Sequence, residues 1–255
     1  MEYTIDMDFL SLDGAQTGEW MLQFLNMVDC AFKNYNNYSR LLGNLLIMER
    51  YIHTLCQGLA ASNKKISIGL ECACNLLWDF LERSITPSDF QDFANDYYAC
   101  LIAYNVGDIH TDAPKEFYNL YFADATPDAY ELLAIEWSSG LLMQLVSIAG
   151  GRVDFDDFEE CEQIDFYGID IMLHILEDAC IELTNTPCLF CRAKDLEKAM
   201  EQVHQTPLFQ KIIKDVQDDI QIALKAVPSE FASLRNKYRK YTIIPEKYAA
   251  ELLEY

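Results

Sequence analysis

The sequence predicts an all-α fold, a compact multi-helix bundle of about ten helices. The first observation behind this prediction is that apolar residues recur every three or four positions over long segments. The clearest stripe runs through Leu41, Leu45, Met48, Ile52, Leu55 and Leu59. That spacing places all six side chains on one face of a helix, as expected for a helix that packs against a core.

The second observation is a recurring dipeptide, in which threonine precedes proline ahead of an apolar periodic run. It occurs at Thr86-Pro87, Thr126-Pro127, Thr186-Pro187 and Thr206-Pro207. Threonine caps free N–H groups at a helix start, and proline suits the first helical position because the N–H it lacks is not needed there. Besides the 41–59 stripe, we expect helices near residues 18–34, 66–84, 87–104, 114–123, 127–149, 165–184, 193–205, 207–226, 229–240 and 245–254.

One segment follows a different pattern. Residues 2–9 alternate polar and apolar side chains, which is typical of a strand, and Asp13-Gly14 is a turn signal. A single strand leaves its backbone groups unpaired, and residues 240–244 are the internal segment best suited to pair with it. We therefore expect either a minor two-stranded pairing near the C-terminal tail or an irregular N-terminal arm.

The domain organisation is predicted to be a single helical domain over residues 1–255. The chain has neither a repeat of fixed period nor a linker rich in Gly, Ser or Pro. The acidic segment 150–164 is the candidate boundary between two sub-layers, residues 1–149 and 165–255. The longest apolar run, Leu132–Gly150, contains Glu136 and Gln144, so it is predicted to be a buried helix and not a membrane span.

The cellular location is predicted to be cytoplasmic. The N-terminal residues lack the basic region and the apolar core of a signal peptide. The nine cysteines are an odd number without the spacing of a disulfide framework, which indicates reduced thiols that act mainly as small core residues.

The net charge of −22 is distributed unevenly along the chain. Residues 1–191 contain 8 of the 19 Lys and Arg but 31 of the 41 Asp and Glu. Such a field repels nucleic acid and anionic membranes and attracts basic surfaces, so the predicted partner is a basic protein. The alternative is a solvated acidic face that only aids solubility.

The densest acidic segment, residues 150–170, interleaves carboxylates with aromatic side chains. A calcium loop starting at Asp154 is excluded because its sixth position is Glu159, where glycine is needed. Two interpretations remain: a solvated connector, or a docking loop whose charges speed encounter and whose rings fill pockets on the partner. The predicted partner-binding residues are Asp154, Phe155, Asp156, Asp157, Phe158, Glu159, Glu160 and Glu162.

Three places in the sequence have residues suited to metal or thiol chemistry. Cys188 and Cys191 would lie in the first turns of a helix and could bind zinc together with His204 and either Cys180 or His174, but the usual second ligand pair is absent. Cys72 and Cys74 point in different directions on a helix, and His110 lacks a supporting cluster beyond Asp108 and Asp112. We therefore predict no metal and no cofactor, and expect His53 and His174 to be hydrogen-bonded core residues.

Signatures of catalysis are also missing. The sequence has no glycine-rich dinucleotide loop, no phosphate-binding loop, no His-Glu-x-x-His and no Gly-x-Ser-x-Gly. The prediction is a protein that is not an enzyme.

The segments NYSRLLGNLLIMERYIHTLCQGLA and LECACNLLWDFLERSITPSDFQDFANDYYACLIAY resemble the all-helical immunity proteins of bacterial polymorphic and contact-dependent toxin systems. The similarity lies in an aromatic opening helix, the Leu76-Leu77-Trp78-Asp79 helix and an aromatic-rich helix after a short loop. The resemblance implies an acidic, cytoplasmic, non-enzymatic protein that blocks one toxin.

The leading hypothesis is thus a non-enzymatic acidic protein that neutralises a basic partner, foremost a cognate toxin. Two alternatives stay open. One is a phage-type anti-defence inhibitor that mimics nucleic acid with its carboxylates. The other is a zinc- or thiol-dependent helical enzyme or regulator centred on Cys188 and Cys191.

Overall fold

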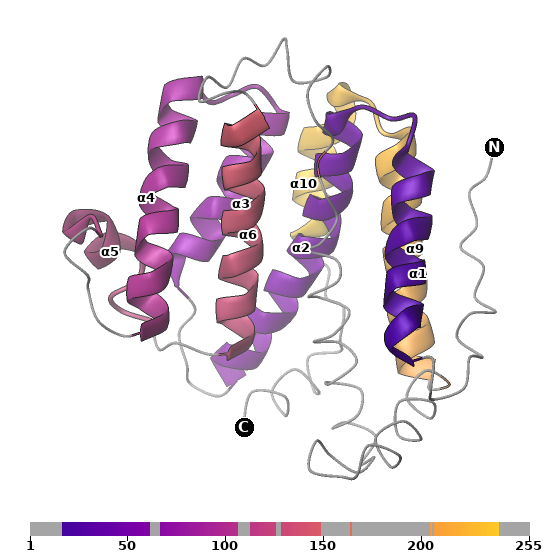
Figure 1. The fold of residues 1–255 in the computed structure, drawn as a ribbon, viewed down its shortest axis with the longest axis horizontal. Coiled ribbons are helices and arrows are strands. Elements are labelled where there is room, and N and C mark those ends of the chain that lie inside the picture. The colour runs from indigo at the N-terminus through magenta and orange to yellow at the C-terminus, as the bar shows by residue number, and fades with distance from the viewer. Residues whose placement is uncertain are drawn as a thin grey trace.

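The computed structural model describes residues 17–61, 67–106, 113–125, 129–148, 164, 205 and 207–239. Within these ranges every regular element is helical, which confirms the all-α prediction (Figure 1). The helices are α1 (Thr17–Phe32), α2 (Asn37–Ala61), α3 (Ile68–Leu81), α4 (Pro87–Val106), α5 (Lys115–Tyr121), α6 (Ala129–Ile148), α9 (Pro207–Lys225) and α10 (Phe231–Tyr238), with a 3₁₀ turn, η3 (Pro228–Glu230), before α10.

Helix α2 lies at the centre of the arrangement. It packs against α9 and α10 on one side and against α3 and α6 on the other, while α4 packs against α3, α5 and α6. Figure 1 shows α4 and α5 at one edge of the molecule and α9 towards the opposite edge, with α2 between them. The C-terminal helices α9 and α10 therefore both pack on α2, and α10 also packs on α3.

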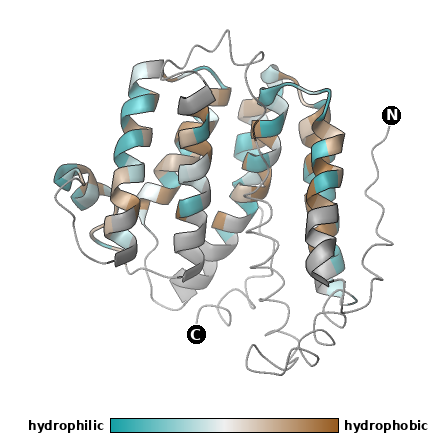
Figure 2. Cartoon of the chain, viewed as in Figure 1, coloured by the Kyte–Doolittle hydropathy of each residue, from teal (hydrophilic) through white to brown (hydrophobic). Residues whose placement is uncertain are grey.

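One continuous hydrophobic cluster joins the described helices, from Phe24 in α1 to Tyr238 in α10. Trp78 and Tyr97 are among its largest fully buried side chains. Figure 2 shows hydrophobic and hydrophilic residues alternating along the described helices. The period of the apolar residues explains this arrangement, because a stripe at three- and four-residue spacing leaves the rest of each helix for solvent.

Where the structure describes them, helices begin at the prolines of the Thr-Pro dipeptides, as predicted. Helix α4 begins at Pro87, and Thr86 Oγ1 accepts a hydrogen bond of 3.2 Å from the N–H of Asp89. Helix α9 begins at Pro207. Helix α3 uses serine instead, since Ser67 Oγ accepts from the N–H of Leu70. Side-chain caps satisfy N–H groups that the first helical turn leaves without a backbone partner.

The longest apolar run forms α6, with Ile135, Leu141, Leu142 and Leu145 buried, as predicted for a core helix. None of the described helices has a stretch long and apolar enough to cross a membrane. The proposed strand pairing of residues 2–9 with 240–244, and the helices expected near 165–184, 193–205 and 245–254, lie outside the described residues. The single-domain organisation remains a prediction.

Candidate functional site

An acidic stripe runs along the exposed side of α4. Asp89, Asp92 and Asp96 are spaced by three and four residues, which puts their carboxylates on one helix face. Asp89 and Asp92 are exposed, and Asp96 is half-buried. Among the described residues, none of the three carboxylates forms an ion pair. Asp89 Oδ2 accepts a 2.7 Å hydrogen bond from Thr86 Oγ1, but among the described residues no cation compensates the three charges.

The neighbouring helix extends this surface. Helix α5 packs on α4 through aromatic contacts, including Phe93 to Phe117 with ring centroids 5.1 Å apart. Glu116 in α5 and Asp124 just after it are exposed. We call the carboxylates of the stripe together with Glu116 and Asp124 the acidic face. Between residues 67 and 125 the sequence has ten Asp and Glu against two cations, Arg83 and Lys115, so local compensation is small.

The C-terminal helices have the opposite balance. Between residues 207 and 239 the sequence contains six Lys and Arg and four Asp and Glu. Five of these cations lie on α9 and α10 and the sixth, Arg239, directly follows α10; Figure 1 shows α9 across the molecule from α4 and α5. The acidic surplus of the described residues is therefore large around α4 and α5, whereas the C-terminal helices have a small basic surplus.

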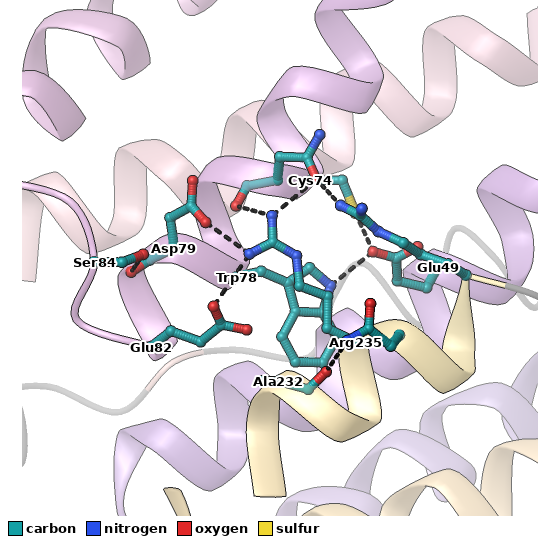
Figure 3. Close-up of polar contacts among 11 residues, drawn as sticks. Glu49, Cys74, Trp78, Asp79, Glu82, Ser84, Ala232 and Arg235 are labelled. Carbon is teal, nitrogen blue, oxygen red and sulfur yellow. Dashed lines mark hydrogen bonds and ion pairs between the residues drawn. The ribbon is translucent and has the colours of Figure 1, made fainter. Parts of the chain in front are cut away.

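One C-terminal cation, Arg235, pairs with carboxylates at the C-terminal end of α3, and Figure 3 shows this contact. The Arg235 guanidinium lies 2.7 Å from Asp79 Oδ1 and 3.3 Å from Glu82 Oε2 through Nη1. Its Nη2 donates a 2.9 Å hydrogen bond to Asn75 Oδ1, which also accepts from Arg239. This pairing fixes α10 on α3, and the single charge of Arg235 offsets part of the charge of Asp79 and Glu82.

A second polar cluster is buried beneath that contact. Trp78 Nε1 donates to Glu49 Oε1 at 2.7 Å, and the Cys74 thiol donates to the same oxygen at 3.4 Å (Figure 3). His53 Nε2 lies 3.1 Å from Glu49 Oε2. Burial raises the pKa of Glu49, but these hydrogen bonds and the histidine outweigh it, so its pKa is lowered. Glu49 is thus held as a buried carboxylate.

The same cluster keeps its thiol unreactive. Cys74 is buried, and burial together with the Glu49 charge raises its thiol pKa well above the ordinary value. A nucleophilic or metal-binding cysteine needs a lowered thiol pKa, so this thiol has the opposite property. Cys74 is a core residue as predicted, whereas Cys72 is only partly buried. His53 makes the expected hydrogen bond, although 28% of its side chain is exposed.

A buried ion pair joins α2 to α9. Arg50 Nε and Nη2 donate to the two carboxylate oxygens of Asp219 at 2.7 and 2.8 Å, and the Tyr238 hydroxyl donates to the same carboxylate. Burial raises the pKa of Asp219 to about 6 despite these partners. The two-pronged geometry fixes the orientation of α9 and α10 on α2. Its role is structural, because the carboxylate is inaccessible to solvent.

Ile164 marks the end of the acidic segment that the sequence singled out. This residue is fully buried, its N–H donates to Asn37 Oδ1 at 3.0 Å, and its carbonyl accepts from Arg40 Nη1 at 3.0 Å. The same Arg40 nitrogen contacts Asp29 Oδ1 at 2.8 Å. Two side chains of the first turn of α2 therefore anchor the chain immediately after residue 163.

The predicted partner-binding residues, Asp154–Phe158 with Glu159, Glu160 and Glu162, lie outside the described residues. So do the candidate zinc ligands Cys188, Cys191 and His204, as well as His110 and His174. Within the described part of the chain, no group of three or more His, Cys, Asp or Glu side chains is placed to hold a metal ion. The acidic stripe of α4 was missed by the sequence reasoning, although its three- and four-residue spacing was a usable signal.

Comparison with known proteins identifies no relative. The chain matches no protein-family model, no curated protein and no solved structure.

Proposed function

We propose that this chain is a non-enzymatic, acidic, cytoplasmic binding protein that neutralises a basic protein partner, with a toxin-immunity protein as the leading case. The observation that carries the proposal is the acidic stripe of α4, whose three carboxylates form no ion pair within the described part of the chain. Carboxylates concentrated on one exposed edge attract a cationic protein more strongly than the same number spread evenly.

The mechanism combines steering with steric blocking. The acidic face attracts the basic partner and orients it, which raises the association rate. The segment 154–162 adds six further carboxylates, with Phe155 and Phe158 as anchors that slow dissociation. Once bound, the helical bundle covers the functional surface of the partner. No step in this mechanism needs a reactive side chain, a metal or a cofactor.

The first prediction concerns the stripe. A variant with Asp89→Asn, Asp92→Asn and Asp96→Asn should associate with a cationic toxin encoded beside its gene about 3- to 10-fold more slowly at low salt. The dissociation rate should change less, because exposed charges act mainly on encounter. Stopped-flow or surface-based kinetics with the purified pair measures both rates.

A matched control keeps the total charge change constant. Glu71→Gln, Glu136→Gln and Asp218→Asn remove three exposed carboxylates from α3, α6 and α9. This control should leave the association rate within about twofold of wild type, because its charges are dispersed. Equal effects of the two variants would contradict a localised docking surface. Displacement of the partner by duplex DNA would favour nucleic-acid mimicry over toxin immunity.

A further inference from the structure

The outer surface of α4 and α5 exposes two large apolar side chains beside the acidic face. Tyr98 on α4 is 51% exposed, and Leu120 on α5 is 65% exposed. Among the described residues only three other large hydrophobic side chains are exposed, and all three lie outside these two helices. An apolar anchor surrounded by charged residues is the usual composition of a protein-binding surface, whereas an acidic surface that only aids solubility needs no such anchor.

Tyr98 lies on the same exposed side of α4 as the acidic stripe. Asp92, Asn95 and Tyr98 are spaced by three residues, so their side chains are neighbours in a row around the helix. All three residues are exposed, while Phe90 and Tyr97 on the inward side of α4 are buried in the core. The Tyr98 ring therefore adjoins the stripe along one of its sides.

Leu120 lies among carboxylates on α5. Glu116 precedes it by one helical turn and Asp124 follows it by four residues, and both are exposed. The inward side of α5 is aromatic, and the Tyr121 ring lies 5.7 Å from the Phe93 ring of α4, measured between centroids. Such contacts hold α5 on α4, so Leu120 projects from a fixed support.

We propose that the acidic face docks a basic amphipathic helix of the partner, with Tyr98 and Leu120 as its apolar anchors. This inference rests on the proposed function, because it names the part of the basic partner that the acidic face contacts. Lysine or arginine side chains at three- and four-residue spacing on the partner helix meet the carboxylates of the stripe, which have the same spacing. Leucine-like side chains beside those cations bury Tyr98 and Leu120.

Charge favours this occupant over a second copy of the chain. A second copy would bring a further net charge of −22 towards the same carboxylates. The acidic face has five carboxylates, and the neighbouring Lys115 offsets one charge at most. A basic amphipathic helix complements both the carboxylates and the two exposed apolar side chains.

The test compares two synthetic helical peptides of equal charge, each about 18 residues or five turns long. The Lys–Leu peptide has lysines at three- and four-residue spacing flanked by leucines on the same half of the helix, and the Lys–Gln peptide has glutamine in place of every leucine. The Lys–Leu peptide should bind the wild-type protein at least about tenfold more tightly, because only leucines bury the anchors. Its binding should shift the ¹⁵N-amide signals of Asp92, Tyr98 and Leu120.

The decisive variant, the anchor variant, combines Tyr98→Ser with Leu120→Ser. Both side chains are exposed, so the variant should stay folded. It should lose about tenfold in affinity for the Lys–Leu peptide and keep its affinity for the Lys–Gln peptide within about twofold. The matched control, Tyr35→Ser with Val227→Ser, removes an exposed tyrosine and an exposed aliphatic side chain elsewhere on the surface. This control should bind both peptides within about twofold of wild type.

Several results would overturn the apolar anchors while leaving an electrostatic acidic face. They are equal affinity of the wild-type protein for the two peptides, unchanged Lys–Leu affinity in the anchor variant, and an equal loss of affinity in the anchor and control variants. Absence of saturable Lys–Leu binding with a Kd below about 1 mM would also contradict the docked helix.

A different result marks failure of the proposed function itself. If Asp89→Asn, Asp92→Asn and Asp96→Asn together leave the affinity for both peptides unchanged, the acidic face does not attract basic segments at all. Sedimentation without peptide checks the other occupant. A dimer of the wild-type protein that the anchor variant dissociates would show that these side chains contact a second copy, which would overturn the proposal.

Discussion

At the scale of single residues, Glu49 shows how a carboxylate is accommodated in the core. It accepts hydrogen bonds from Trp78 and Cys74 and contacts His53. A buried charge without such partners would cost several kcal/mol, and removing one partner leaves another group unsatisfied. The cluster links α2 to α3, so the ionised form of Glu49 contributes to the stability of this helix pair.

Glu49→Gln should make the stability of the protein less dependent on pH. The folded-state pKa of Glu49 is below its ordinary value of 4.5, so its contribution is present above that pH and is lost as the pH falls through the lower folded-state value. At pH 7 the variant should be about 1–3 kcal/mol less stable, and the gap should shrink below pH 4.5. Urea unfolding between pH 7 and pH 3 measures this.

Glu71→Gln, an exposed change on α3, is the control for that series and should leave stability nearly unchanged. A gap between wild type and Glu49→Gln that stays constant down to pH 3 would contradict the depressed pKa.

The environment of some of these residues could be predicted from the sequence, and that of others could not. The sequence predicted a buried Cys74 and a hydrogen-bonded His53. It did not predict that Glu49, Arg40 and Asp219 are buried, because their pairing depends on tertiary contacts. Asp219 meets Arg50 across 169 positions of sequence, and helical periodicity contains no information about such a distant partner.

At the scale of elements, Gly69 at the start of α3 lies in close contact with the residue that follows α5, Phe122. A Cβ on Gly69 would lie 2.8 Å from Phe122 Cζ, and Phe122 is almost fully buried just after α5. The absence of a side chain thus lets α3 lie against the aromatic cluster that also holds α4.

Gly69→Ala should therefore destabilise the protein even though alanine favours helix formation. The clash should cost about 1–3 kcal/mol, against about 1 kcal/mol gained in helix propensity. Thermal or urea unfolding measures the net change. In a Phe122→Leu background the clash disappears, and the same substitution should become neutral or stabilising. Stabilisation by Gly69→Ala in the wild-type background would show that the close approach is absent.

The elements themselves were the most predictable part of the fold. Helices α4 and α9 begin at Pro87 and Pro207, the residues predicted. The first and last residues of α3, α5 and α6 differ from the predicted ones by one to three positions. Capping threonines and apolar periodicity are local signals, so a sequence contains them directly. The residue range 229–240 was predicted as one helix, but the chain forms η3 and then α10, because Pro228 fits the start of a short 3₁₀ turn.

At the scale of the whole molecule, the sequence revealed an excess of acid before residue 192 but not where the charge gathers. The structure shows that Arg235 pairs with Asp79 and Glu82 and leaves the stripe of α4 without an ion pair among the described residues. Helix α10 packs on α3 and not on α4, so its cation Arg235 offsets carboxylates of α3. Such a contact cannot be read from composition, and it decides which carboxylates the proposed cationic partner would meet uncompensated.

The central claim is that a localised acidic surface attracts a basic protein, and the salt dependence of association tests it most directly. The association rate of the wild-type protein with its cationic partner is measured from about 20 mM to 500 mM salt, across which the screening length shortens several-fold. We expect the association rate to fall by about tenfold or more over this range, and to fall less when Asp89, Asp92 and Asp96 are neutralised. An association rate that changes less than about twofold over this range would contradict it.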